Sequence, residues 1–220
     1  MSHPCIAEIQ DKDWLPKADW LQCHQDLLKR RDSLRDTQVV FFGDSITQGW
    51  GGDGKAAWDK YFGQFRPLNT GIGGDETSHL LWRIENGALD GISPKALVLL
   101  IGTNNLGNAG HTGKDTAEGV KLVVQKVRQK LPATKVLLLG VFPRDAEPNT
   151  HFRKEIAIVN GIISKLHDGS TIHYVDYSPV FLRDGGKLPQ ELSPDYLHLS
   201  PAAYELWARA MSFCWVGLSK

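Results

Sequence analysis

QVVFF (38–42) is a short, continuous apolar run, and ALVLLI (96–101) and TKVLLLGV (134–141) repeat this pattern further along the chain. Strands covered by helices on both faces are continuously apolar, whereas strands with one solvent-exposed face alternate apolar and polar residues. RPLNT (66–70) and TIHYVDY (171–177) are weaker candidates for two more strands. Together, the runs predict a parallel sheet of about five strands.

Helical patterns separate the apolar runs. Apolar residues between 120 and 131 recur at the spacing of one helical face. This predicts a helix that opens at Asp115, with Glu118 three residues later, and stops at Pro132. Further helices are expected at 76–87, at 151–167 and after Ser200, the predicted N-cap, with Pro201 at the first helical position.

Strands that alternate with helices define the fold class. We expect an α/β protein with a three-layer, doubly wound (flavodoxin-like) sheet and helices on both faces. Residues 13–36 predict an extra N-terminal helix packed on this core. Because no repeat, low-complexity tract or linker interrupts the chain, residues 1–220 are predicted to form a single domain.

Composition excludes several classes of protein. The chain has 25 Lys and Arg against 25 Asp and Glu, so it lacks the basic excess of a nucleic-acid-binding protein. No apolar stretch is long enough to cross a membrane, and the first residues, MSHPCIAEIQ, lack a signal-peptide pattern. We expect a cytoplasmic protein without nucleic-acid or stable membrane partners; a secreted protein whose signal was removed stays open. Cys5, Cys23 and Cys214 have no zinc or disulfide spacing and are expected to be reduced thiols.

Polar residues follow the predicted strands, where ligands bind in open α/β sheets. Four segments supply them: GDS (43–45) after the first strand, GIGGD (71–75) after the second, GTNN (102–105) after the third and DYLH (195–198) before the last helix. Because the carboxyl ends of parallel strands share one edge of the sheet, we expect these groups to lie close together. Taken singly, each has an ordinary structural explanation as a cap or turn residue.

These residue types suit acyl transfer. Ser45 is expected where a strand turns into a helix, and its hydroxyl is a weak nucleophile unless a base removes the proton. His198 is the candidate base, and Asp195 is close enough in sequence to orient the imidazole. The backbone N–H groups of Ser45 and Gly74 and the side-chain amide of Asn104 are candidate donors to a developing oxyanion.

With these motifs the sequence resembles the SGNH (GDSL-type) hydrolases. The family's marker blocks match FFGDSITQG (41–49), NTGIGGDET (69–77), LLIGTNN (99–105) and SPDYLHL (193–199). Within the family, GIGGD, GTNN and LLWRIENG (80–87) are most similar to the branch of the platelet-activating-factor acetylhydrolase catalytic subunits. Ile46 replaces the Leu of GDSL, and GTNN replaces GxND; both changes occur in that branch.

The resemblance implies a serine esterase that needs no metal or other cofactor. We expect it to hydrolyse short-acyl, especially acetyl, esters of a small molecule through an acyl-enzyme intermediate. A lysophospholipase or thioesterase with the same residues stays open, as does a non-catalytic interaction module on this fold. The natural substrate is not fixed, and a homodimer through the N-terminal helix is suggested only by analogy with the family.

Two other features are interpreted structurally. GWGGDGKA (49–56) nearly matches a phosphate-binding loop, but Ala56 lacks the magnesium-binding hydroxyl and GDSITQ separates the loop from its strand. Nucleotide binding is therefore disfavoured. Trp50, Trp58 and Trp82 lie near the predicted edge, where they form either a stacking platform for sugars or part of the core; the core is favoured.

Overall fold

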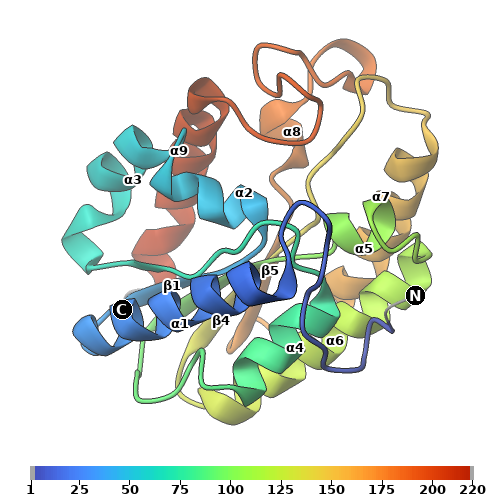
Figure 1. Cartoon of the computed structure of the whole chain (residues 1–220). Coiled ribbons are helices and arrows are strands. Elements are labelled where there is room, and N and C mark those ends of the chain that lie inside the picture. Colours follow the sequence, from blue (N-terminus) through green and yellow to red (C-terminus); the bar gives the residue numbers. More distant parts are fainter. Residues whose placement is uncertain (1–2, 219–220) are drawn as a thin grey trace.

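A five-stranded parallel sheet forms the centre of the molecule (Figure 1). This computed structural model describes residues 3–218 and the side chains of residues 3–212. The strand order is β2-β1-β3-β4-β5, and every neighbouring pair is parallel, which confirms the predicted fold. The strands are β1 (Val39–Gly43), β2 (Leu68–Asn69), β3 (Ala96–Leu100), β4 (Lys135–Leu139) and β5 (Ile172–Val175).

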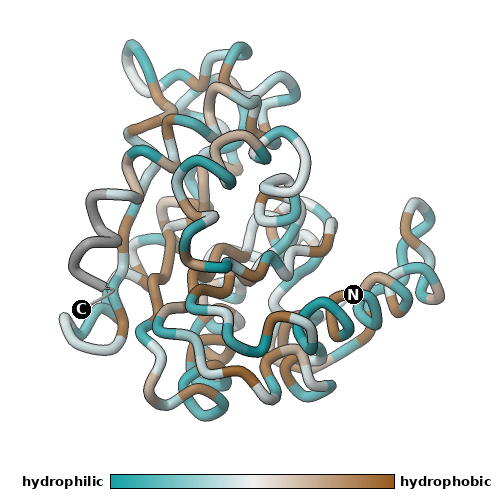
Figure 2. Tube along the Cα trace, turned by 90° about the vertical axis from the view of Figure 1, so that its left-hand side faces the viewer, coloured by the Kyte–Doolittle hydropathy of each residue, from teal (hydrophilic) through white to brown (hydrophobic). Residues whose placement is uncertain are grey.

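Helices cover both faces of this sheet. One face packs against α4 (Thr77–Glu85), α6 (Gly113–Lys130) and α7 (His151–Ile163), and the other against α3 (Lys55–Phe62), α8 (Ser178–Phe181) and α9 (Pro201–Leu218). Successive strand side chains point to opposite faces, so Val40 and Phe42 enter one apolar cluster while Val39 and Phe41 enter the other. This explains the uninterrupted apolar runs, and Figure 2 shows the apolar segments gathered in the interior.

Short helical turns connect these elements. They are α2 (Ser45–Gln48), η1 (Gly49–Gly51), η2 (Gly63–Phe65), α5 (Thr103–Gly107), η3 (Ser164–Leu166) and η4 (Asp184–Gly186). Two of them, α2 and α5, begin two and three positions after the last residues of β1 and β3. They therefore stand at the carboxyl edge of the sheet, where the sequence analysis expects the functional groups.

The N-terminal helix is shorter than predicted. It forms α1 (Lys17–Ser33) rather than 13–36, and Pro16 directly precedes its first residue. Trp14 lies in a tight loop before the helix, which is closed by reciprocal backbone hydrogen bonds between Lys12 and Leu15 of 3.2 and 3.0 Å. Proline is suited to a helix start and not to its interior, so the apolar pattern before it belongs to a separate segment.

The start of α6 also differs from the prediction. Thr112 is its N-cap, and its hydroxyl oxygen accepts a hydrogen bond of 3.2 Å from the backbone N–H of Asp115. The predicted start at Asp115 with Glu118 is wrong, because the carboxylate of Glu118 instead pairs with Lys121 one turn later. Ser200 does cap α9, since its hydroxyl accepts the N–H of Ala203 at 3.3 Å.

The tryptophans near the edge pack into the molecule. Trp50 is fully buried, with its ring centroid 4.7 Å from that of Tyr204 and 4.6 Å from that of Trp207. Trp58 packs on an aromatic residue of β1, and Trp82 packs on Trp20 of α1 with centroids 5.1 Å apart. Their interpretation as packing residues is therefore confirmed.

Cys5 and Cys23 are free thiols, while the side chain of Cys214 lies outside the described part of the chain. Burial raises the pKa of both free thiols, which keeps them protonated at neutral pH. Within residues 3–218, no helix combines the length and the apolar character needed to cross a membrane.

Candidate active site

The register of the sheet sets the position of the site. Gly43 at the end of β1 pairs with Leu100 at the end of β3, so the two strands end side by side. The direction in which strands are added reverses at this point: β2 lies on one side of β1, whereas β3, β4 and β5 lie on the other side. Ligand sites of doubly wound sheets lie at such switch points. Ser45 and Asn104 stand on either side of it.

Ser45 is held at the first position of α2. Asp44 is the N-cap, and its carboxylate accepts the backbone N–H of Ile46 at 3.0 Å. A Cβ at Gly43 would collide with the carbonyl oxygen of Leu100, so the strand end tolerates no side chain there. Tyr204 of α9 donates its hydroxyl proton to the carbonyl oxygen of Ile46 at 2.6 Å, which fixes α2 from behind.

Ser45, His198 and Asp195 form one hydrogen-bonded chain. Ser45 Oγ lies 3.0 Å from His198 Nε2, and His198 Nδ1 lies 2.6 Å from Asp195 Oδ2. With the ring proton on Nδ1 donated to the carboxylate, Nε2 is free to accept the serine proton. The three predicted residues, separated by up to 153 positions in the chain, are thus brought into contact.

Backbone donors hold the carboxylate of Asp195 in place. Its Oδ1 accepts the N–H groups of His198 and Leu197 at 2.7 and 3.0 Å. Partial burial raises the pKa of Asp195, but the hydrogen bonds from the ring and backbone of His198 and from the backbone of Leu197, together with the nearby imidazole, lower it by more in total. The carboxylate is therefore ionised at neutral pH, as stabilisation of an imidazolium requires.

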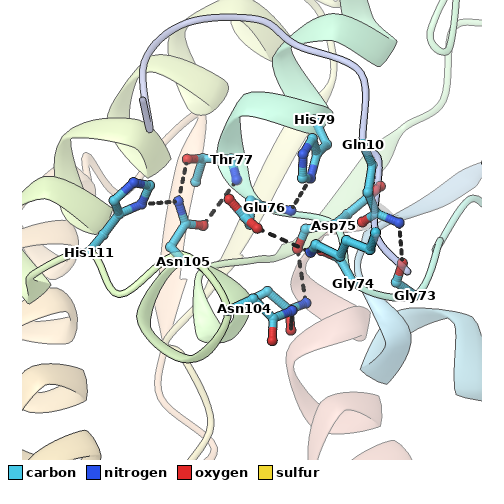
Figure 3. A network of polar contacts seen from close by, with 12 residues as sticks. Gln10, Gly73, Gly74, Asp75, Glu76, Thr77, His79, Asn104, Asn105 and His111 are labelled. Carbon is cyan, nitrogen blue, oxygen red and sulfur yellow. Dashed lines mark hydrogen bonds and ion pairs between the residues drawn. The ribbon is translucent and has the colours of Figure 1, made fainter. Parts of the chain in front are cut away.

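The candidate oxyanion donors Gly74 and Asn104 lie on the segments that follow β2 and β3. Gly74 has a left-handed backbone, with φ of +76°, and a Cβ at neighbouring Gly73 would stand 3.8 Å from Ser45 Cβ. Asn104 is 6% exposed and donates one amide hydrogen to the carbonyl oxygen of Asp75 at 3.0 Å (Figure 3). Its Nδ2 carries a second hydrogen, which remains for a ligand.

A buried ion pair that the sequence analysis did not single out supports this loop. Arg83 of α4 donates to Asp75 at 2.7 Å, and neither side chain is exposed. Trp20 of α1 donates its indole N–H to the other oxygen of Asp75 at 2.7 Å. Burial raises the pKa of Asp75, and the guanidinium opposes that shift. The signal was present in GIGGD and LLWRIENG, but both blocks served only as family markers.

The start of α4 is fixed by its N-cap Glu76 and by two neutral side chains, His79 and Asn105. His79 Nδ1 accepts the backbone N–H of Glu76 at 2.9 Å, and burial lowers the pKa of His79 to about 3. Asn105 accepts the N–H of Thr77 at 3.0 Å and donates to its hydroxyl at 2.9 Å (Figure 3). These bonds order the chain directly after Asp75.

An open cleft of about 680 Å³ begins at Ser45. One wall is α1 and the other is the glycine-rich loop that nearly matches a phosphate-binding pattern. The lining mixes polar and apolar groups; its charged and amide side chains are Asp26 and Arg30 on α1, Gln48 at the end of α2, Asp53 on the loop and Asn69 in β2. Within the described residues, no group of three or more His, Cys, Asp or Glu side chains is arranged to hold a metal ion.

The comparisons place this architecture in a known family. The model of the GDSL-like lipase/acylhydrolase family matches residues 41–206, and the chain belongs to this family of ester-hydrolysing enzymes. The platelet-activating factor acetylhydrolase IB subunit alpha1 of Bos taurus is 35% identical over 192 residues, which are 87% of this chain and 80% of that protein.

Solved structures show the same fold. An acetyl xylan esterase is 25% identical and superposes with a TM-score of 0.64 over 79% of this chain and 96% of that one. A GDSL-like lipase from Bacteroides thetaiotaomicron gives a TM-score of 0.71 over 87% of this chain and 96% of that one, at 20% identity. The predicted family and the predicted class of enzyme are confirmed.

Asp44 yields a testable pH dependence of stability. Its carboxyl is 1% exposed, and burial raises its pKa from 3.8 to about 7. Between these values the folded state binds the proton more tightly than the unfolded state, so stability falls as the pH rises from about 4 to 7. Asp44→Asn removes this loss, worth roughly 4 kcal/mol at full ionisation.

Urea unfolding at pH 4.5 and pH 8 measures the effect. The unfolding free energy of Asp44→Asn minus that of the unmodified protein should be larger at pH 8 than at pH 4.5. Asp168→Asn is the control: hydrogen bonds from the Thr171 hydroxyl and neighbouring backbone N–H groups lower the pKa of Asp168, so its carboxylate is ionised at both pH values and the effect of the substitution should be nearly the same at each. An Asp44→Asn difference that is equal at both pH values would contradict the buried, proton-binding carboxyl.

Proposed function

We propose that the protein is a serine esterase that hydrolyses short-acyl, chiefly acetyl, esters through an acyl-enzyme intermediate. The observation that carries this proposal is the continuous chain from Ser45 Oγ through His198 to Asp195, with contacts of 3.0 and 2.6 Å. It stands beside candidate oxyanion donors at the switch point of the sheet. Nucleophile, base and orienting group within hydrogen-bond reach are the requirement for acyl transfer by serine.

In the proposed reaction Ser45 Oγ attacks the ester carbonyl while His198 Nε2 takes its proton. Asp195 holds the ring through Nδ1 and stabilises the positive charge that forms on the imidazole. The N–H groups of Ser45 and Gly74 and the free amide hydrogen of Asn104 donate to the carbonyl oxygen as it becomes negative. The imidazolium then gives its proton to the leaving alcohol, and the acyl group stays on Ser45.

Water completes the cycle. His198, neutral again, takes a proton from a water molecule that attacks the acyl-enzyme carbonyl, and the proton passes to Ser45 Oγ as the acid leaves. The side chains of His198 and Asp195 are 49% and 55% exposed, so water reaches this side of the site. No step needs a metal or other cofactor, since the protein's own groups balance every proton.

Two observations support a short acyl group on a polar alcohol. Two of the three similar proteins named above are an acetylhydrolase and an acetyl xylan esterase, and both names specify an acetyl group. In the cleft beside Ser45, charged and amide side chains interrupt the apolar surface to which Leu27 and Ile72 contribute. Such a lining favours a hydrated alcohol over a long hydrocarbon chain, because burying polar groups against hydrocarbon is costly.

Ser45→Ala tests the nucleophile. The variant should lose hydrolysis of p-nitrophenyl acetate by roughly 10⁴-fold or more, because the attacking oxygen is gone. Circular dichroism should show an unchanged fold, and Ser33→Ala, at the end of α1, should keep full activity. A fluorophosphonate should phosphonylate Ser45 in the unmodified protein, with loss of fluoride, and raise the mass of the peptide that contains it. Full activity in Ser45→Ala, or labelling at another residue alone, would overturn the assignment.

A series of p-nitrophenyl esters tests the acyl group. With acetyl, butyryl, octanoyl and palmitoyl esters, kcat/KM should be highest for acetyl and fall with chain length. A maximum at octanoyl or palmitoyl would favour the lysophospholipase or thioesterase alternative. No turnover of any ester by the pure, folded protein would contradict the proposed esterase.

A further inference from the structure

A segment ahead of α1 contacts the candidate oxyanion loop. This segment, residues 8–15, is called the strap here; it precedes the part of the chain that the family model matches. In Figure 1 it belongs to the dark blue chain that passes in front of α4. The loop that it contacts, residues 73–76, carries Gly74.

Two strap side chains donate to consecutive carbonyl groups of the loop. Gln10 Nε2 donates to the carbonyl oxygen of Gly73 at 3.3 Å, a contact drawn as a dashed line in Figure 3, and Lys12 Nζ lies 2.5 Å from the carbonyl oxygen of Gly74. The ammonium group also forms an ion pair of 3.1 Å with Glu76. Both peptide units that flank the Cα of Gly74 are thus held from their carbonyl side.

A third strap residue covers the glycine itself. The indole of Trp14 lies where the Cβ of any other residue at position 74 would stand, so the ring and a side chain cannot both occupy this place. Trp14 is 62% exposed, and the Lys12 ammonium stands 5.7 Å from its ring centroid. Glycine is therefore required at position 74 for two reasons: the backbone has a φ of +76°, and the Trp14 ring occupies the place of a side chain.

The bond from Gln10 acts on the proposed oxyanion donor directly. The carbonyl of Gly73 and the N–H of Gly74 belong to one planar peptide unit, so fixing the oxygen fixes the direction of the N–H. A donor on the carbonyl also polarises the unit and makes its N–H a stronger donor. Lys12 fixes the next peptide unit, whose N–H, that of Asp75, donates to the carbonyl oxygen of Ile72 at 3.3 Å.

The strap is itself anchored. The backbone N–H of Glu8 donates to the carbonyl oxygen of Ser78 in α4 at 3.3 Å, and Asp11 accepts the N–H of Lys17 at the start of α1 at 3.0 Å. Gln10 is fully buried, and the side chain of Lys12 is 16% exposed. Side chains held in this way lose little further freedom when they hold the loop.

We propose that Gln10 and Lys12 are positioning residues for the oxyanion hole, which aim the N–H of Gly74 through the carbonyl groups on either side of it. The proposal rests on the esterase function proposed above. It assigns a role in the reaction to a segment outside the matched region of the family model. Neither residue touches the substrate; both act through the loop.

Gln10→Met and Lys12→Met remove the two donors while keeping side-chain length. On p-nitrophenyl acetate each should lower kcat by roughly tenfold, less than the 10²–10³ expected for losing an oxyanion donor itself, with KM within about twofold. Lys12→Arg should recover most of the rate, because arginine also donates with a positive charge. Lys121→Met, which breaks a surface ion pair with Glu118 on α6, is the matched control and should keep full activity.

A reversible methylboronic acid supplies a second readout, because its adduct with serine resembles the tetrahedral intermediate. Its inhibition constant should rise in Gln10→Met and Lys12→Met by the factor by which kcat/KM falls, as expected for a loss of transition-state binding. Asn104→Ala serves as the reference for a missing donor. Thermal melts by circular dichroism identify which variants are folded. If Lys12→Met unfolds because its ion pair with Glu76 is lost, Gln10→Met still tests the role of the strap.

The outcomes separate the two proposals. Turnover by the unmodified protein and its loss in Ser45→Ala establish the esterase, whatever the strap variants do. Folded Gln10→Met and Lys12→Met with wild-type kcat and boronate affinity would overturn the role of the strap alone. A raised KM with unchanged kcat would also overturn it, because the strap would then bind substrate rather than orient the loop.

Discussion

The ion pair between Asp75 and Arg83 is the interaction on which the edge of the sheet depends. Both side chains are fully buried, and breaking such a pair leaves an uncompensated charge that costs about 3–5 kcal/mol. Asp75 also accepts from Trp20 of α1, and its carbonyl oxygen accepts from Asn104. A single residue thus joins α1, α4 and the turn after β3, and it directly follows Gly74.

Much of the fold could be predicted because burial on both faces makes a strand continuously apolar. QVVFF, ALVLLI and TKVLLLGV correspond to β1, β3 and β4 within one or two residues at each end. Helix ends were predicted less well, since they depend on single side chains. Pro16 starts α1 four residues later than the apolar pattern indicates, and Thr112 rather than Asp115 caps α6.

The candidate site also contains contacts that the sequence predicts and contacts that it does not predict. That Ser45, His198 and Asp195 come into contact could be predicted, because the topology brings strand ends together at one edge of the sheet. The supporting contacts could not. Gln10 and Lys12 meet the loop across more than 60 positions of sequence, and no periodicity or local motif marks such a contact. A buried polar residue in a segment without regular structure is visible only once the chain has folded.

The most direct test of the account is to trap the acyl-enzyme. The protein is mixed with p-nitrophenyl acetate, quenched in acid within the first turnover and digested for peptide mass spectrometry. The account predicts a burst of p-nitrophenol equal to the enzyme concentration, with one acetyl group on the peptide that contains Ser45 and none in Ser45→Ala. Hydrolysis that proceeds with no acetyl group on Ser45 would contradict it.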